Sequence, residues 1–380
     1  MSAAELVLGN ARIVLPDAIV DGHVVVRDGL IAAIGSGAVR ADIDCEGDYL
    51  IPGLVELHTD HLEGHYAPRP SVRWNPVAAV LAHDAQLATS GVTTVFDALR
   101  VGFDRDAEIG LSDMQTLATA IEDCVAHDRL RADHYIHLRC EVSAPDCLES
   151  FAHFADLDRL RIASLMDHAP GQRQFARLEA YALYYQSKMK LDDAAFIAFC
   201  ERRVAESAAN SPHNRAVIAD ACRARGIVLA SHDDATLDHV EEAVAQGIAV
   251  AEFPTTLEAA RASHEAGMAV LMGGPNVMRG GSHAGNVSAR QLAEAGVLDI
   301  LSSDYIPFSL IQSAFFLGEV VDTISLPQAI RMVSDKPARA AGFEDRGAIR
   351  PGLRADLVRV RVDAHVPVVR AVWRQGERVA

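Results

Sequence analysis

The sequence predicts an α/β protein, a distorted (β/α)8 barrel of the TIM type with a small β-sandwich domain formed by both chain termini. Two patterns predict this fold class. Within residues 54–344, apolar segments of strand length alternate with helical patterns, which is typical of parallel strands joined by crossover helices. Residues 1–53 and 345–380 instead hold short strand patterns separated by Gly and Asp turns, and strands from the two ends can pair in one sheet.

Eight apolar runs in the central region are the expected barrel strands. They are Leu54–Asp60, Thr93–Leu99, Tyr135–Val142, Arg161–His168, Ile227–Asp233, Ala249–Thr255, Ala269–Gly274 and Asp299–Asp304. Eight strand–helix units in this length fit a TIM-type barrel, which typically takes about 250 residues. A doubly wound open sheet is the alternative, but the Gly-x-Gly-x-x-Gly turn that it favours is absent from the sequence.

Helix signals fill the connections between these strands. Asn75 and Pro76 form a cap followed by a first-turn proline, and Gly91 ends the helix that they begin. The stretch 170–226 is too long for one crossover, so we expect it to carry a helical insert over the barrel mouth. Further helices are predicted at 112–127, 236–246, 256–266 and 288–295.

The amino-acid composition indicates which kind of protein this is and which kinds of partner are excluded. Hydrophobic residues make up 50% and charged residues 23% of the 380, as in soluble globular chains. The net charge of −17 argues against a nucleic-acid partner held by general electrostatics. No apolar run reaches the roughly 18 residues of a membrane helix, and Met1–Glu5 lacks a signal-peptide pattern, so we expect a cytoplasmic protein without membrane contact. The six cysteines lack metal-finger spacing and are expected to be reduced thiols.

Residues of metal-ligand type recur where the predicted strands end, and TIM-barrel enzymes place their sites on that face. Positions i and i+2 of a strand share one side, so His58 and Asp60 can hold one ion. One such residue alone is most simply a helix cap, but six on five strand ends are difficult to explain by capping. Mixed N and O donors suit Zn²⁺, Mn²⁺ or Fe²⁺, and the sequence does not choose among them. The predicted ligands of one or two divalent ions are His58, Asp60, Glu141, His168, His232 and Asp304.

Three segments resemble the amidohydrolase superfamily, and together they span most of the chain. Leu50–Asp60 resembles the start of its first barrel strand, and Gly91–Val95 resembles its second strand. Asp335–Leu357 is similar to its return into the small β domain. This resemblance implies a metal-dependent hydrolase built on a barrel.

The chain departs from the superfamily pattern in two places. The usual first-strand His-x-His is here His58-x-Asp60. Glu252 ends the sixth strand where a second late histidine is expected, and His168 comes one strand early. Either the strand count is off by one, or the second metal is held differently, with His168 or Glu252 completing the centre. Glu141 is the predicted carboxylate bridge between two ions, in place of a modified lysine.

Further motifs are similar to one branch of the superfamily: His58–His65 with Pro68–Pro70, Leu165–Gln174, Ala230–Asp234 and Arg279–His283. The similarity implies hydrolysis of the α–β phosphoanhydride of a ribosyl 5-triphosphate bearing a 1-methylphosphonate, with release of diphosphate, in phosphonate catabolism. Arginine suits phosphate oxygens because it offers paired donors, and glycine-rich turns can present backbone N–H groups. The residues expected to bind this small anionic substrate are His65, Arg69, Arg173, Lys188, Arg215, Asp233, Asn276, Arg279, Ser282 and His283.

The predicted mechanism uses the metal centre to activate water and Asp304 to take its proton, with attack on the α-phosphorus. Two alternatives stay open at this point. One is a cyclic amidase or deaminase on the same barrel, because fold alone does not fix function. The other is a non-catalytic binding subunit of a phosphonate-degrading assembly. The sequence also leaves the oligomeric state open, and a homo-oligomer is compatible with it.

Overall fold

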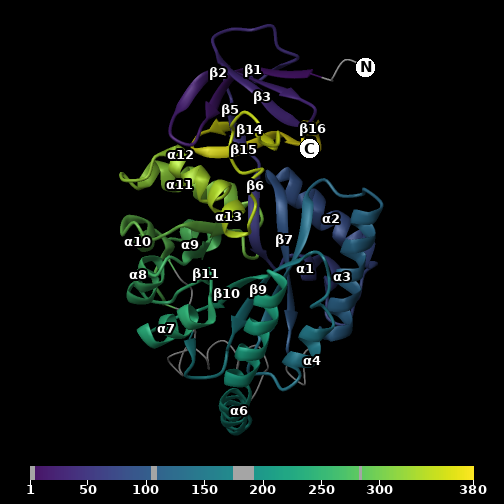
Figure 1. The fold of residues 1–380 in the computed structure, drawn as a ribbon, viewed down its shortest axis with the longest axis vertical. Helices are drawn as coiled ribbons and strands as arrows, with labels where there is room; N and C mark the ends of the chain where they lie inside the picture. Colours follow the sequence, from purple (N-terminus) through teal and green to yellow (C-terminus); the bar gives the residue numbers. More distant parts are fainter. Residues whose placement is uncertain (1–4, 104–108, 174–191, 282–284) are drawn as a thin grey trace.

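The computed structural model describes residues 5–103, 109–173, 192–281 and 285–380. One of its two eight-stranded sheets is parallel, runs in chain order and forms a barrel (Figure 1). The first and last strands of this barrel meet at an isolated bridge between Thr59 and Asp304. The predicted fold class, a TIM-like barrel with a small terminal sheet, is confirmed. The barrel strands are β6 (Leu54–Thr59), β7 (Val92–Val101), β8 (Asp133–Glu141), β9 (Leu160–Met166), β10 (Val228–His232), β11 (Val250–Glu252), β12 (Ala269–Gly273) and β13 (Ile300–Ser302).

Helices surround the barrel and supply its crossovers (Figure 1). The five helices predicted from local signals correspond to α2, α3, α7, α8 and α10, and α6 lies inside the predicted insert. The helices are α1 (Leu62–Tyr66), α2 (Pro76–Thr89), α3 (Leu111–Ala126), α4 (Cys147–Ala152), α6 (Asp193–Arg225), α7 (Leu237–Gln246), α8 (Leu257–Glu265), α9 (Gly274–Arg279), α10 (Ala289–Glu294), α11 (Ser309–Val320), α12 (Leu326–Arg331) and α13 (Asp335–Ala340).

Capping residues explain where the longest helices begin and end. The side chain of Asn75 accepts a hydrogen bond from the N–H of Ala78, with Pro76 in the first turn of α2. At the start of α6 the Asp192 carboxylate accepts from the N–H of Ala195, and the helix ends at Gly226. Gly226 has a φ of +67°, the left-handed conformation that glycine adopts without steric cost.

The two chain ends form a second sheet above the barrel in Figure 1. Its order is β16-β15-β14-β5-β1-β2-β3, with β4 beside β1, so the C-terminal β14 pairs directly with the N-terminal β5. One face buries a cluster that includes Leu8, Ile13 and Trp373. The strands are β1 (Glu5–Val14), β2 (Ile19–Arg27), β3 (Leu30–Ser36), β4 (Ile43–Asp44), β5 (Tyr49–Pro52), β14 (Leu357–Asp363), β15 (Val366–Arg374) and β16 (Glu377–Arg378).

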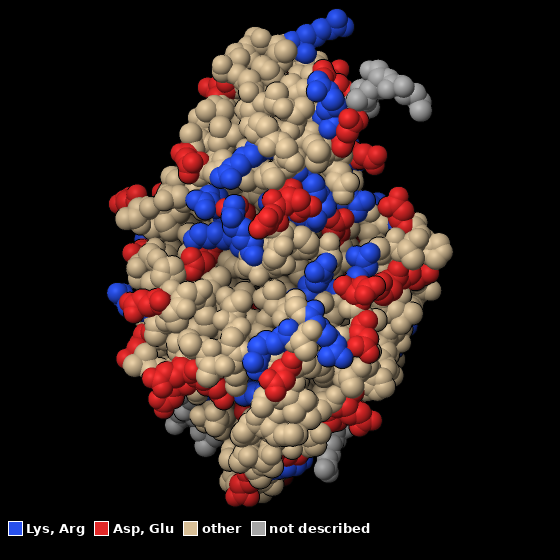
Figure 2. Space-filling view, viewed as in Figure 1, with Lys and Arg blue, Asp and Glu red and all other residues tan. Residues whose placement is uncertain are grey.

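Ion pairs join this sheet and its connection to the amino end of the barrel. Asp133, at the start of β8, lies 2.8 Å from Arg346, 2.7 Å from Arg354 and 3.4 Å from Arg374. Basic side chains on the face drawn in Figure 2 likewise lie mostly beside acidic ones. The domain boundaries at residues 53 and 345 stay a prediction. No helix in the described ranges is both long and apolar enough to cross a membrane.

The barrel interior is apolar at one end and polar at the other. The apolar layer packs Val55, Leu57, Phe96 and Ile162 together with apolar residues of the later strands. Polar side chains follow at the carboxyl ends of the strands, on the side of the barrel where α6 projects (Figure 1). The fold therefore gathers the strand-end residues next to a packed apolar layer.

Candidate metal centre and active site

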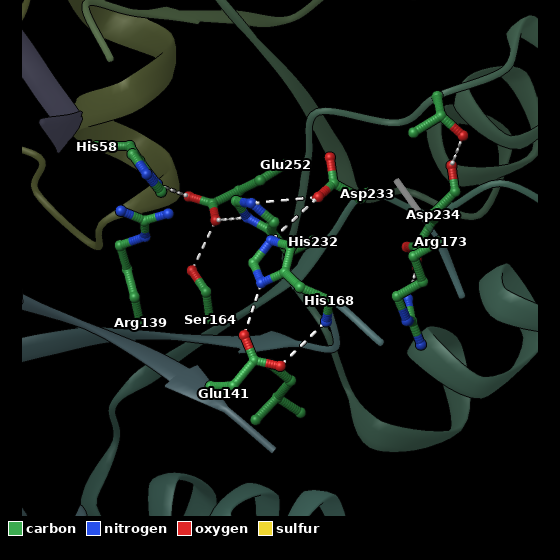
Figure 3. A network of polar contacts seen from close by, with 12 residues as sticks. His58, Arg139, Glu141, Ser164, His168, Arg173, His232, Asp233, Asp234 and Glu252 are labelled. Carbon is green, nitrogen blue, oxygen red and sulfur yellow. Dashed lines mark hydrogen bonds and ion pairs between the residues drawn. The ribbon is translucent and has the colours of Figure 1, made fainter. Parts of the chain in front are cut away.

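Three buried side chains from three strands converge at the carboxyl end of the barrel. His58 comes from β6, His232 from β10 and Glu252 from β11, and one ligand atom of each lies within 4.8 Å of the others. The Nδ1 of His58 is 3.1 Å from one Glu252 oxygen, and the Nδ1 of His232 is 3.2 Å from the other (Figure 3). The carboxylate thus lies between two imidazoles.

Further contacts hold this carboxylate in place. The hydroxyl of Ser164 donates to Glu252 at 2.6 Å, and the Nε2 of His137 lies 3.9 Å from it. Burial favours the protonated acid, but the histidines around it hold the pKa of Glu252 well below its usual range. Glu252 is therefore a buried anion among histidines, which is the charge that a cation site needs.

A second group of ligand atoms shares His232 with the first. His168, His232 and Asp233 also place their ligand atoms within 4.8 Å of one another. One oxygen of Asp233 lies 3.6 Å from His168 and 3.5 Å from His232. Glu141 orients His168 from behind, because its carboxylate lies 2.6 Å from the Nδ1 of that ring and accepts the backbone N–H at 3.0 Å. A carboxylate on the second ring nitrogen is the usual support for a histidine that binds metal.

Asp304 lies beside these groups, just beyond β13. Its N–H donates to the backbone oxygen of His58 at 3.1 Å, which places the last strand next to the first. Burial and the nearby Asp60 raise the pKa of Asp304 to about 6. Asp60 itself lies 3.0 Å from the guanidinium of Arg139 on β8.

The residues present fit a divalent cation. The donors are imidazole nitrogens and carboxylate oxygens, the set that Zn²⁺, Mn²⁺ and Fe²⁺ accept. The Oδ2 of Asp233 is buried and has no hydrogen-bond donor among the described residues. A buried carboxylate oxygen without a partner is unfavourable unless a cation or water satisfies it.

Comparison with known proteins assigns the family. The family model described as "Amidohydrolase family" matches residues 77–380. The chain belongs to the amidohydrolase family. It is a hydrolase, and dependence on a divalent metal is typical of this family and agrees with the two ligand clusters.

Individual relatives of this amidohydrolase differ widely in identity. The alpha-D-ribose 1-methylphosphonate 5-triphosphate diphosphatase of Escherichia coli is 46% identical, over 98% of this chain and 100% of the relative. An imidazolonepropionase of Streptomyces griseus is 26% identical over 89% of this chain and 86% of its own length. The solved N-acetylglucosamine-6-phosphate deacetylase of Pasteurella multocida superposes with a TM-score of 0.65 at 15% identity, over 99% of each chain, which reflects a shared fold.

The strand count behind the predicted ligands agrees with the structure of this amidohydrolase. His58, His168 and His232 reach the clusters, and Asp304 lies beside them. The other two predicted ligands lie next to these groups, where Asp60 pairs with Arg139 and Glu141 contacts His168, and their metal binding stays a prediction. Glu252, which the sequence offered only as an alternative to His168, lies in the middle of one cluster.

The residues predicted to bind substrate are scattered. Arg173 is buried in ion pairs with Asp234 and Glu242, apart from the histidines in Figure 3, and Arg215 lies 3.8 Å from the same Glu242. Asp233 joins the second cluster. His65 contacts Gln86, and Asn276 accepts a hydrogen bond from the N–H of Ala289. Arg69 and Arg279 are exposed. The other three predicted residues, Lys188, Ser282 and His283, lie outside the described residues.

Sequence reasoning missed the charged residues that line the barrel within β7 and β8. Arg139 and Glu141 are separated by two positions, so the strand alternation puts both on one side. Arg100 on β7 lies 3.5 Å from Glu141. Extending the two-residue period backward from Glu141 through Arg139 to His137 would have found the polar face of β8.

Proposed function

We propose that this hydrolase cleaves the α–β phosphoanhydride of alpha-D-ribose 1-methylphosphonate 5-triphosphate, leaving the 5-phosphate and releasing diphosphate. The observation that carries the proposal is the pair of ligand clusters around His232, in a chain 46% identical over its whole length to a diphosphatase with that substrate in its name. The proposed substrate is a small polyanion. A cationic centre with arginines beside it suits such a ligand.

The proposed ligands of one ion are His58, His232 and Glu252, and those of another are His168 and Asp233. Asp60 and Glu141 are proposed to act through Arg139 and His168, their partners in the structure. The bound metal would supply Lewis acidity, which activates water and offsets charge on a phosphoryl oxygen. The choice among Zn²⁺, Mn²⁺ and Fe²⁺ stays a prediction.

Asp304 is the proposed general base. Its carboxylate comes from the last barrel strand and lies beside the first, where it can accept a proton from the attacking water. Burial matters for this role because a base whose pKa lies near the working pH combines a deprotonated carboxylate with adequate basicity. Attack in line on the α-phosphorus then expels diphosphate.

Product analysis tests the proposal. Phosphorus NMR of the reaction with the ribosyl triphosphate is expected to show diphosphate and the 5-phosphate in equal amounts. Release of orthophosphate would place attack at the γ-phosphorus and overturn the assignment. Turnover of a dihydropyrimidine in place of the triphosphate would favour the cyclic amidase alternative.

Metal analysis supplies an independent test of the centre. His232→Ala is expected to lose metal and activity together, because His232 belongs to both clusters. His127→Ala, which removes an exposed histidine at the end of α3, is the control and should retain metal. Full metal content and full rate in His232→Ala would remove His232 from the centre.

A further inference from the structure

Two arginines that no motif indicated lie side by side in the barrel. Arg100 on β7 and Arg139 on β8 are register partners in the parallel pairing of these strands. Neighbouring strands are about 4.8 Å apart, and paired residues point to the same face of a sheet. Arg139 shares its face with His137 and Glu141, which contact the metal-centre residues, so both arginines project into the barrel mouth.

Among the described residues, one nitrogen of each guanidinium group has no acceptor. Arg139 reaches Asp60 through Nη1 at 3.0 Å, and Arg100 reaches Glu141 through Nη2 at a long 3.5 Å. Glu141 is also engaged by His168 and by the hydroxyl of Ser143. The Nε atoms of Arg100 and Arg139 are both buried, with no acceptor among the described residues. Two adjacent cations repel each other, and an anion held by the exposed parts of both side chains would offset this repulsion.

The position of Arg139 connects this pair to the reaction centre. Figure 3 shows its guanidinium beside His58 and Glu252. Its charge is one of those that act on the pKa of both His58 and Asp304. An anion bound to Arg139 therefore lies against the proposed metal ligands and the proposed base.

Accessibility separates this pair from the arginines that the sequence suggested. The side chains of Arg100 and Arg139 are 33% and 19% exposed, so a ligand in the barrel mouth can reach them. Arg173 and Arg215 are 4% and 5% exposed and lie next to Glu242. All four arginines contact carboxylates, but Arg100 and Arg139 are also partly exposed, so they can contact a ligand in addition.

We propose that Arg100 and Arg139 form an anion-binding subsite that holds the non-bridging oxygens of the phosphoryl group under attack. The inference rests on the proposed function for the identity of that group. Guanidinium N–H donors placed here would offset the charge that grows on these oxygens as the leaving group departs.

Phosphate binding to the metal-loaded enzyme tests the subsite without turnover. Calorimetry with inorganic phosphate is expected to show a Kd raised about tenfold to a hundredfold in Arg139→Met and in Arg100→Met, the range for losing a charged hydrogen bond. Arg159→Met is the matched control, because Arg159 is 27% exposed and pairs with Glu122 at the opposite end of the barrel sheet. Unchanged phosphate affinity in both test variants would overturn the proposal.

Two further variants control for a loss of folding or of the metal centre in Arg139→Met. Arg139→Met leaves Asp60 without its partner, so Asp60→Asn/Arg139→Met removes both charges, and Arg139→Lys keeps the positive charge with fewer paired donors. Metal content and melting temperature of each variant show whether the centre is intact. Among variants with wild-type metal content, weaker phosphate binding supports the subsite, and wild-type affinity contradicts it.

Kinetics separate this proposal from the proposed function. If the pair holds the attacked phosphoryl group, the Arg139→Met loss in kcat/KM is equal for the triphosphate and for the shortened diphosphate substrate. A loss confined to the triphosphate would move the pair to the tail and contradict the subsite as stated. Orthophosphate release by the wild-type enzyme, combined with Arg139-dependent phosphate binding, would overturn the proposed function and leave an anion site.

Discussion

The imidazole of His58 lies 3.1 Å from the carboxylate of Glu252, although 194 residues separate them in the chain. Each side chain is buried and comes from the carboxyl end of its own strand. The contact exists only because β6 and β11 face each other across the same barrel. The barrel fold therefore places the negative charge of Glu252 next to His58 in the centre.

Glu252→Gln tests that anion with almost no change in shape. The amide lacks the negative charge that lies between two imidazoles, so metal affinity is expected to fall at least about tenfold, the lower end for changes in metal-site carboxylates. Competition with a chelator measures this affinity. Glu258→Gln, on the exposed face of α8, should leave it unchanged. Equal affinities for both variants would exclude Glu252 as a ligand.

Asp304→Asn tests the proposed base. Loss of a general base typically costs about 10²–10⁴ in rate, so kcat should fall in that range while the variant retains more metal than His232→Ala. A general base acts only when it is ionised, so the wild-type rate should rise with pH as the carboxylate of Asp304 loses its proton. The variant should lack this acidic limb. An unchanged pH profile would contradict the role.

Alanine substitutions of Arg173 and of Arg279 are expected to differ in their effect on the free energy of unfolding. Arg173 pairs with Asp234 and Glu242 inside the protein, and breaking a buried pair typically costs about 3–5 kcal/mol. Arg173→Ala is therefore expected to lower the free energy of unfolding by about 3 kcal/mol, whereas Arg279→Ala at an exposed helix end should change it by less than about 0.5 kcal/mol. Urea denaturation measures both. Equal stabilities would show that Arg173 is free to hold substrate.

A buried cluster of one aspartate and two histidines outside the centre leads to a prediction about stability. Asp97 lies 2.9 Å from His83 and 2.7 Å from His134, all fully buried. Burial alone would lower the pKa of His134, but Asp97 and Asp84 raise it to about 9. The raised pKa of His134 adds to the free energy of unfolding. This contribution is complete below the pKa of an unfolded histidine, about 6.5, and is lost as pH rises through about 9.

Asp97→Asn should therefore destabilise the fold by about 3–5 kcal/mol near pH 6 and by less at pH 10. Denaturant titrations of variant and wild type at both pH values measure the two differences. Asp123→Asn, in an exposed ion pair with Arg129, should cost under about 1 kcal/mol at either pH. A difference that stays constant between pH 6 and pH 10 would contradict a charged His134.

The fold was predictable because its signals are local and repeated. Each barrel strand is an apolar run, and caps such as Asn75 and glycines such as Gly91 mark the helix ends. The site was predictable only in part. Strand-end position indicated His58 and His232, whose ligand atoms lie in the two clusters. The same rule indicated Asp60 and Glu141, and spacing does not reveal that Arg139 and His168 lie beside them. Metal binding by Asp60 and Glu141 stays a prediction.

The substrate residues were least predictable for the same reason. A glycine-flanked arginine such as Arg173 gives the same sequence signal whether it faces a ligand or an internal acid. Its partners Asp234 and Glu242 lie 61 and 69 residues away along the chain. Such pairings depend on how β10 and α7 pack, which periodicity does not encode.

Because the barrel closes through the bridge between Thr59 and Asp304, it can close only after Asp304 has been synthesised. At roughly 5–20 residues per second, a ribosome would make Asp304 some 12–50 s after Thr59. The nascent chain would therefore hold His58 for most of its synthesis with no closed barrel and no proposed base beside it. Strand β14, which pairs with β5, emerges later still. Incomplete chains would thus lack the closed barrel and the complete centre.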